Sequence, residues 1–215
     1  MNNSDITTVL LVDDHEIVRG GFRRLFDTTS DILVADEAAT GEEACTKYFE
    51  CRPDVVVMDL NLPGIGGLEA SRRILERHAA ARILIFSVHE NAVYLKKALE
   101  QGNLGYLSKR SASTEMIEAV RCIARGETFI GRDLIGALAD TVRSSDQGPL
   151  ENLSPREFEV FRLLASGKSV NEIAVIEVLS PKTIANHYTR VKQKLDVQNM
   201  GEITRLAIQL GIISP

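Results

Sequence analysis

Five apolar runs alternate with five segments of helical periodicity over the first 125 residues, and this alternation restricts the fold more than any other feature. Each run is short enough for a buried strand, and the segments between them repeat apolar positions every three or four residues. The predicted strands are 9–12, 33–35, 55–58, 83–86 and 105–107, and the predicted helices are 17–26, 42–49, 68–78, 92–99 and 114–125. Strand–helix units in this order predict an α/β fold, a parallel sheet covered by helices on both faces.

Polar residues directly follow four of these strands. Right-handed crossovers favour the flavodoxin-like strand order 2-1-3-4-5, in which the first and third strands are neighbours and ligands bind beyond their carboxyl ends. Asp13 and Asp14 follow the first strand, Asp59 the third, Ser87 the fourth, and Lys109 comes just after the fifth. The sequence therefore predicts one pocket that contains three carboxylates, a hydroxyl and an ammonium.

This set of side chains suits a divalent cation and a phosphoryl group. Crowded carboxylates repel one another unless a cation lies among them, and hard oxygen ligands that can share phosphate suit Mg²⁺. A carboxylate in such a pocket can attack phosphorus and form an acyl phosphate, and Asp59 is the candidate nucleophile. Lys109 would supply positive charge to the phosphoryl oxygens, and Ser87 a hydroxyl. The simpler alternatives are that Asp14 only caps a helix and that Ser87 and Lys109 are ordinary surface residues.

Four strings in the first part of the chain resemble the receiver domain of two-component response regulators. They are LVDDH at 11–15, MDLNLPG at 58–64, Ser87 and YLSK at 106–109, and the resemblance covers about residues 7–126. It implies that Asp59 accepts a phosphoryl group from a sensor histidine kinase. It also implies that Asp14, Asp59 and the main-chain carbonyl of Asn61 bind Mg²⁺, with Asp13 assisting through water.

The same resemblance assigns a switch to two further residues. Lys109 would pair with the phosphoryl group, while Ser87 and Tyr106 would report phosphorylation to the surface around residues 92–107. Many receivers have Pro after this lysine, but Arg110 stands here. This departure puts a cis peptide bond at the turn in doubt, because such bonds are largely restricted to proline.

The residues after the receiver-like part change in character. An amphipathic helix is expected over 133–142, and the polar, turn-rich stretch 143–149 follows it, as in a connector with a hinge. We therefore expect a receiver domain at 1–128, a linker at 129–149 and a second domain at 150–215. The first 129 residues hold 15 basic and 20 acidic side chains, whereas residues 182–194 hold four basic side chains and no acidic one. That basic stretch could face phosphates.

Helix-start signals mark the last domain as an all-α unit of four helices. Ser154 and Ser169 each begin a capping box, Ser180 is an N-cap followed by proline, and a fourth helix is expected over 201–210. In the third helix one face is apolar, through Ile184, Tyr188, Val191 and Leu195. The opposite face carries Lys182, Ala185, Asn186, Thr189, Lys192 and Gln193. An apolar back with a basic, amide-bearing front is typical of a helix that enters the major groove, although it also occurs on solvated surfaces.

The strings of this domain resemble the LuxR-type helix-turn-helix. They are LSPRE at 153–157, LLASG at 163–167, NEIA at 171–174 and LSPKTI at 179–184, with His187, Lys194 and Leu195. Together with the receiver they make the chain resemble a transcription regulator of the NarL/FixJ family. By that resemblance Ala185, Asn186 and Thr189 would read bases, and Lys182, Thr183, Arg190 and Lys192 would lie nearer the DNA backbone.

These resemblances imply a phosphorylation-dependent, DNA-binding transcriptional regulator. Its expected partners are a sensor histidine kinase, double-stranded promoter DNA, RNA polymerase and a second copy of the chain on activation. It would not be an enzyme beyond its own Mg²⁺-dependent phosphoryl transfer and dephosphorylation. No apolar stretch reaches the roughly 20 residues that cross a bilayer, and Cys45, Cys51 and Cys122 lack metal-ligand spacing, so a cytoplasmic protein with three apolar thiols is expected.

One residue departs from the LuxR-type pattern. Glu177 stands where an apolar residue, often Leu, is usual, and a buried unpaired carboxylate would cost several kcal/mol. Either the helix shifts in register so that Ile176 or Val178 fills the core, or Glu177 reaches solvent from a shortened helix.

Two rival functions remain open at this point. An aspartate-nucleophile phosphatase would also use Asp59, but such enzymes typically carry a second acid where Asn61 stands. A protein-interaction adaptor would use the last domain to bind other proteins instead of DNA.

Overall fold

The computed structural model describes residues 6–88, 92–111, 113–136, 149–177, 179–210 and 212–213. The chain divides into two compact units, residues 1–140 and 141–215, and each is described by itself. Within the described residues, no helix is both long enough and apolar enough to cross a membrane.

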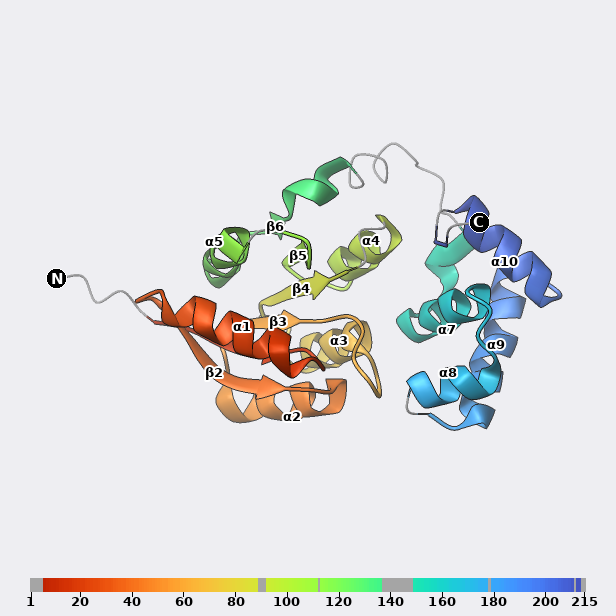
Figure 1. Cartoon of the computed structure of the whole chain (residues 1–215), viewed down its shortest axis with the longest axis horizontal. Helices are drawn as coiled ribbons and strands as arrows, with labels where there is room; N and C mark the ends of the chain where they lie inside the picture. The colour runs from red at the N-terminus through yellow and green to blue at the C-terminus, as the bar shows by residue number, and fades with distance from the viewer. Residues whose placement is uncertain are drawn as a thin grey trace. The chain divides into compact units, whose positions relative to one another are not determined.

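The first unit is built on a parallel sheet of six strands in the order β2-β1-β3-β4-β5-β6 (Figure 1). The strands are β1 Thr7–Val12, β2 Ile32–Ala38, β3 Val55–Met58, β4 Ile83–Ser87, β5 Gly105–Ser108 and β6 Phe129–Ile130. The predicted flavodoxin-like order 2-1-3-4-5 is confirmed, and β6 extends the sheet by one strand.

Strand β6 lies where the sequence suggested a connector. The Phe129 amide donates a hydrogen bond of 3.0 Å to the carbonyl of Leu104, and the Gly131 amide one of 2.9 Å to that of Tyr106. The short helix η1 (Arg132–Leu134) follows, and its Leu134 is fully buried. Residues 129–134 therefore pack with the first unit. Most of the helix expected over 133–142 lies outside the described residues.

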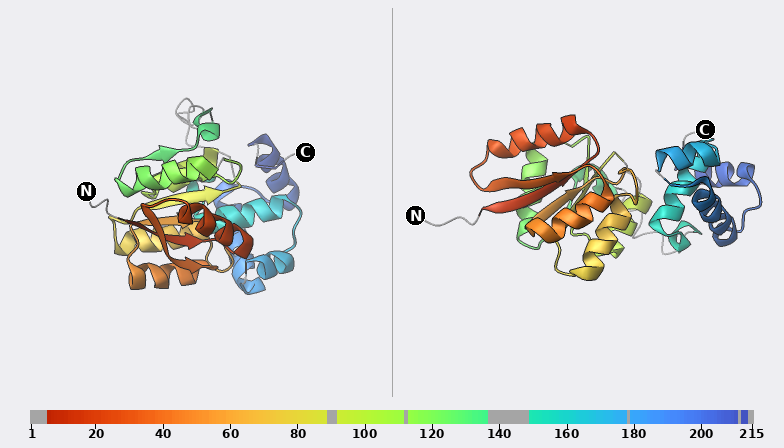
Figure 2. Two further views of the ribbon diagram at one scale, coloured as in Figure 1. Left: turned by 60° about the vertical axis from the view of Figure 1, so that its left-hand side comes forward. Right: turned by 90° about the horizontal axis from the view of Figure 1, so that it is seen from below.

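Helices cover both faces of the sheet. They are α1 Glu16–Asp27, α2 Gly41–Cys51, α3 Gly67–Arg77, α4 Ala92–Glu100 and α5 Ser113–Ala124, each close to its predicted position. Phe26 of α1 and Met116 and Val120 of α5 pack in one core cluster with Val9 and Val57 of the strands. Helix α1 lies on one side of the sheet, and α2 and α3 lie on the other (Figure 2).

Strand register gathers the carboxyl ends of the strands at one edge. Val12 is the partner of Met58, and Ser87 is the partner of Ser108. The residues just beyond are tied to the neighbouring strand, since the Asp59 amide donates to the Val12 carbonyl and the Lys109 amide to the Ser87 carbonyl, both at 2.8 Å. The backbone alone therefore brings the residues after β1, β3 and β5 to one place.

The second unit contains the short helix η2 (Pro149–Asn152) and the helices α7 Pro155–Ala165, α8 Val170–Ile176, α9 Pro181–Leu195 and α10 Met200–Gln209. The predicted helix starts are confirmed, because Ser154 and Ser169 form capping boxes and the Ser180 side chain accepts a hydrogen bond from the Thr183 amide. Phe158, Phe161 and Ile184 are fully buried between the helices. Four α-helices thus enclose a separate core, as predicted.

Candidate functional site

A half-buried lysine joins two buried aspartates at the edge of the sheet. The ammonium of Lys109 lies 2.6 Å from Oδ2 of Asp13 and 2.8 Å from Oδ2 of Asp59. The exposed fractions of the two aspartates are only 4% and 2%, so water screens these charges weakly. One positive charge therefore serves two negative ones.

Electrostatics in this pocket favour a further positive charge. Burial raises the pKa of Asp59, the contacts with Lys109 lower it, and the nearby charge of Asp13 raises it, so that the pKa lies above its ordinary value. Burial alone would lower the pKa of Lys109, but its hydrogen bonds to the two carboxylates outweigh that effect and raise the pKa. An additional cation would relieve the repulsion between the carboxylates.

A third carboxylate and a histidine complete the pocket. Nδ1 of His15 lies 2.7 Å from Oδ1 of Asp14 and 3.1 Å from Oδ1 of Asp13. One ligand atom from each of Asp13, Asp14, His15 and Asp59 can be chosen so that all lie within 4.8 Å of one another. The N-cap of α1 is His15, so the interpretation of Asp14 as a simple helix cap is wrong. This acidic cluster is typical of a Mg²⁺ site.

The loop after β3 is packed tightly around Asp59. The Asn61 amide donates to Oδ1 of Asp59 at 3.3 Å, and the Gly67 amide donates to the Leu60 carbonyl at 3.0 Å. A Cβ atom at Gly67 would lie 1.8 Å from the main-chain oxygen of Asp59. No larger residue fits without moving the loop that holds Asp59.

Ser87 and Tyr106, the predicted switch residues, are fully buried side chains in the adjacent strands β4 and β5. The Lys109 side chain is only 15% exposed. The alternative that Ser87 and Lys109 are ordinary surface residues is therefore wrong. The described residues contain no cis peptide bond, in agreement with Arg110 in place of Pro.

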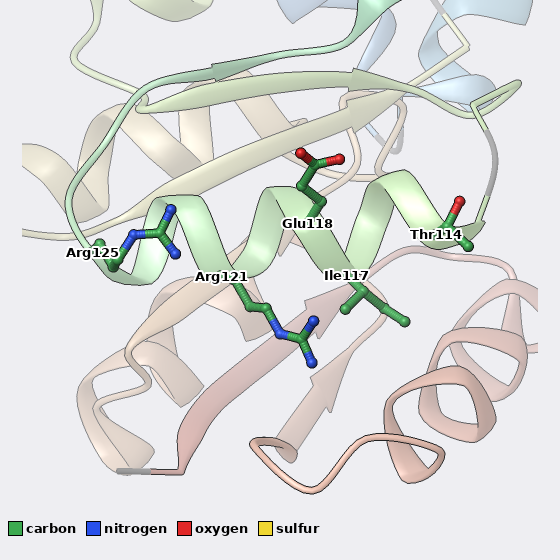
Figure 3. A pocket seen from close by; sticks show the side chains of 5 residues that line it. All are labelled: Thr114, Ile117, Glu118, Arg121 and Arg125. Carbon is green, nitrogen blue, oxygen red and sulfur yellow. The ribbon is translucent and has the colours of Figure 1, made fainter. Parts of the chain in front are cut away.

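A separate hollow of about 330 Å³ lies along helix α5 (Figure 3). Its lining residues are Thr114, Ile117, Glu118, Arg121 and Arg125. Arg121 is bound to the carboxylate of Asp31 by two hydrogen bonds of 2.7 and 2.8 Å. None of the lining residues belongs to the predicted sites.

In the second unit, the predicted DNA-facing residues lie on α9, opposite its buried face. Ile184, Val191 and Leu195 are buried, and Tyr188 is half-buried. Of the predicted contact residues, Lys182, Ala185, Asn186, Thr189 and Arg190 are exposed, whereas Thr183 and Lys192 are half-buried. The apolar back and polar front of the helix follow the predicted pattern, and base and backbone contacts remain predictions.

Local contacts restrain three of these side chains. The Thr183 hydroxyl lies 2.8 Å from that of Ser180, and the Thr189 hydroxyl donates to the Ala185 carbonyl at 2.9 Å. The Lys192 ammonium lies 5.0 Å from the centre of the Tyr188 ring, a cation–π distance. The exposed side chains of Lys182, Asn186 and Arg190 are freer to reach a ligand.

The expectation that Glu177 reaches solvent is wrong, and so is the expectation that Ile176 fills the core. Glu177 is 8% exposed, Ile176 is 46% exposed, and the position of Val178 lies outside the described residues. The Glu177 carboxylate is instead paired with the guanidinium of Arg156 from the first turn of α7. Burial raises the pKa of Glu177 to about 6, because desolvation outweighs the attraction of Arg156. The chain thus accommodates an acid in the core by pairing it.

Comparison with known proteins agrees with both predicted domains. Residues 9–121 match the response regulator receiver domain, and residues 151–207 match the luxR family of bacterial regulatory proteins. The response regulator UvrY of Escherichia coli (strain K12) is 38% identical over 206 residues, which is 95% of this chain and 94% of that protein. The chain belongs to the NarL/FixJ family of response regulators.

Other relatives extend this agreement over the whole response regulator. The transcriptional activator protein ExaE of Pseudomonas putida is 38% identical over 208 residues, 95% of this chain and 97% of that protein. The crystal structure of a LuxR-family response regulator from Aurantimonas sp. SI85-9A1 is 41% identical, with a TM-score of 0.63 over 65% of this chain and all of that chain. RcsB of Salmonella enterica serovar Typhimurium, bound to a promoter, is 25% identical, with a TM-score of 0.67 over 97% of this chain and all of that chain. This response regulator is therefore a DNA-binding transcriptional regulator.

Three features of this response regulator escaped sequence reasoning. His15 stands in the LVDDH string, but its contacts with Asp13 and Asp14 depend on the turn that follows β1. Gly67 ends a run rich in glycine at 64–67, which is a signal of close backbone approach that could have been used. Arg156 carries no signal as a partner of Glu177, since 21 residues separate them.

Proposed function

We propose that this response regulator accepts a phosphoryl group on Asp59 and thereby controls the binding of its second unit to promoter DNA. The observation that supports this proposal is the position of Lys109, whose ammonium bridges Asp13 and Asp59 while Asp14 lies beside them. Carboxylate, ammonium and metal-ligating oxygens are the groups that phosphoryl transfer requires in one place.

In this mechanism the Asp59 carboxylate attacks phosphorus, one of its oxygens forms the new bond to phosphorus, and the donor leaves with the electrons of the bond that breaks. Lys109 holds Oδ2 of Asp59 and offsets charge on the phosphoryl oxygens. The Asn61 amide holds Oδ1 of Asp59 and so orients the carboxylate. After transfer, Lys109 and the Ser87 hydroxyl reorient toward the phosphoryl group, and Tyr106 responds in the neighbouring strand.

The donor set fits Mg²⁺, because the carboxylate oxygens of Asp13, Asp14 and Asp59 converge and all are hard ligands. We assign these residues and the main-chain carbonyl of Asn61 to the ion. When bound, Mg²⁺ neutralises charge on the transferring oxygens. Asp13 and Asp14 would hold the ion, and Lys109 keeps Asp13 oriented. The protein would catalyse only its own phosphoryl transfer and dephosphorylation, and would not turn over other substrates.

The partners follow from these two sites. A sensor histidine kinase supplies the phosphoryl group, and α9 enters the major groove of double-stranded promoter DNA, with its basic residues near phosphates. Solved structures of the relative RcsB include two dimers bound to two parallel DNAs and a promoter complex with a phosphomimetic. By analogy, this chain would pair with a second copy when phosphorylated and act on RNA polymerase at the promoter.

The decisive experiment is phosphoryl incorporation from a small acyl-phosphate donor in the presence of Mg²⁺. Asp59→Asn should abolish incorporation, because an amide is not a nucleophile toward phosphorus. Asp54→Asn is the matched control, since Asp54 lies at the opposite end of the same strand and is bound to Thr8, and it should leave incorporation unchanged. Label that persists on another residue of Asp59→Asn would overturn the assignment.

A further inference from the structure

The end of helix α8 is held by a single arginine from helix α7. Nη1 of Arg156 is hydrogen-bonded to the Glu177 carboxylate, and Nη2 donates to the main-chain oxygen of Glu177 at 3.0 Å. The exposed fractions of the two side chains are 11% and 10%. One planar guanidinium therefore binds both the side chain and the backbone of Glu177, which defines a direction as well as a distance.

This contact lies at the turn of the helix-turn-helix. Glu177 is the C-cap of α8, and Ser180, three residues later, is the N-cap of α9. The contact with Arg156 therefore lies three residues before the N-cap of α9. The Leu179 amide also donates to the Ala174 carbonyl at 2.9 Å, so the residue just before the N-cap of α9 is bound to α8.

The other end of α9 is held by the next residue of α7. The Glu157 carboxylate, which is 2% exposed, accepts a hydrogen bond of 2.6 Å from the Lys194 ammonium in the last turn of α9. Two adjacent residues of the first turn of α7 thus fix the two ends of the helix, Arg156 through Glu177 and Glu157 directly.

We propose that Arg156 and Glu177 are positioning residues for sequence-specific DNA binding, which set the angle at which α9 presents Ala185, Asn186 and Thr189 to the bases. The proposal rests on the DNA-binding function proposed above. Although an apolar residue is usual at this position in LuxR-type domains, in this chain an apolar contact in place of the pair would remove the two directional hydrogen bonds from Arg156. Dispersion has little directional preference, so the angle of α9 would be less well defined. Base reading depends on hydrogen-bond geometry, whereas contacts with phosphates tolerate small rotations.

The test uses the full-length protein and two duplexes of equal length, one selected by the wild-type protein from a random pool and one unselected. Arg156→Lys keeps the charge but removes the planar fork. The double variant Arg156→Met/Glu177→Leu replaces the pair by an apolar contact, which often preserves stability. The control Ile203→Val removes one methylene group from the fully buried core of α10 and leaves the pair intact.

Both pair variants should bind the selected duplex about tenfold more weakly, a loss comparable to one mismatched base pair. Their affinity for the unselected duplex should match that of the wild-type protein, and Ile203→Val should retain the wild-type preference. Wild-type affinity of the double variant for the selected duplex would overturn the proposal, as would an equal loss on both duplexes. If Arg156→Lys fails to fold, the double variant decides. A wild-type protein that selects no duplex would instead overturn DNA binding itself.

Discussion

The two units of this response regulator bury charged side chains in opposite ways. In the receiver pocket one ammonium, that of Lys109, is shared by Asp13 and Asp59, and the carboxylate of Asp14 lies alongside. In the helical unit each buried carboxylate has its own cation, Arg156 for Glu177 and Lys194 for Glu157. The pocket is left with excess negative charge, whereas the helical pairs are neutral.

This difference distinguishes a reactive site, the receiver pocket, from the ion pairs of the helical unit, which only fix the positions of helices. Excess buried charge is unfavourable unless another charged group arrives, so the receiver pocket is prepared for a cation and a phosphoryl group. A neutral pair gains nothing from a ligand, but it fixes the helices that it joins. The pKa of Glu157 is lowered because the contacts with Lys194 and Ser154 outweigh burial, while that of Glu177 is raised, so the two helical pairs differ in how firmly they stay ionised.

The largest effect is expected where the shared cation is removed. Lys109→Ala should lower the free energy of unfolding of the receiver unit by about 4 kcal/mol, because it removes the cation that two buried carboxylates share. Mg²⁺ should restore part of this loss by supplying positive charge. The measurement is denaturant-dependent hydrogen exchange of amides in β3. Lys47→Ala is the control, since its pair with Asp36 is partly exposed and should contribute at most about 1 kcal/mol. Equal losses of unfolding free energy in the two variants would mean that the Lys109 charge contributes no more to stability than a surface ion pair does.

The pocket should also depend on a close backbone approach that the helical pairs do not need. Gly67→Ala places a methyl group where Cβ lies 1.8 Å from the Asp59 oxygen, so the loop must move. We expect a loss of about 3 kcal/mol in stability together with slower phosphoryl incorporation. Gly21→Ala is the control, because it lies in α1 with no atom within 4 Å of its Cβ position, and it should stabilise the helix by about 1 kcal/mol. Wild-type phosphoryl incorporation by Gly67→Ala would show that the loop after β3 can shift without disturbing Asp59.

A pH titration can test whether Glu177 is ionised in its pair with Arg156. The pKa of Glu177 is about 6 in the folded protein against an ordinary value of 4.5, so the folded state binds the proton more tightly. Its contribution to stability is therefore fully present below pH 4.5 and is lost as the pH rises through 6, a change of about 2 kcal/mol. Hydrogen exchange of α8 and α9 amides should show this slope in the wild-type protein and not in Glu177→Gln. The opposing contribution of Glu157 is common to both proteins and cancels in the difference. Identical slopes would show that the pair stays fully ionised.

The sequence predicted those parts of the structure that follow from local patterns. Apolar periodicity placed five strands and five α-helices of the first unit close to their observed positions, and parallel register then forces Asp13, Asp59 and Lys109 to one edge. Cap residues such as Ser154 and Ser169 set helix starts for the same reason, since their hydrogen bonds reach only three residues along the chain.

Contacts between distant residues could not be predicted in this way. Strand β6 is only two residues long, and its pairing with β5 depends on where α5 ends. The partner of Glu177 comes from another helix, so the sequence showed only that an acid in that position needed a solution. The helical pattern does not indicate whether the Glu177 side chain reaches solvent or pairs with Arg156. The packing of α7 against the end of α8 decides between these two arrangements.

The smallest effects are expected from substitutions on the exposed face of α9, opposite its buried face. Asn186→Ala should change sequence preference by about 1 kcal/mol at one base pair, because an amide can read adenine through two hydrogen bonds. Lys192→Ala should weaken binding to all duplexes evenly and reduce the salt slope by about 1, since its ammonium is predicted to contact phosphates instead of bases. Binding measured over a range of salt concentrations on selected and unselected duplexes separates the two outcomes.

The Lys192 variant needs a control for packing. The Lys192 ammonium lies over the Tyr188 ring, so Lys192→Ala removes a packing contact as well as a charge. Lys192→Arg keeps both the charge and the stacking and should therefore retain binding. If Asn186→Ala and Lys192→Ala lose specificity equally, the front of α9 does not divide into base-reading and phosphate-binding residues.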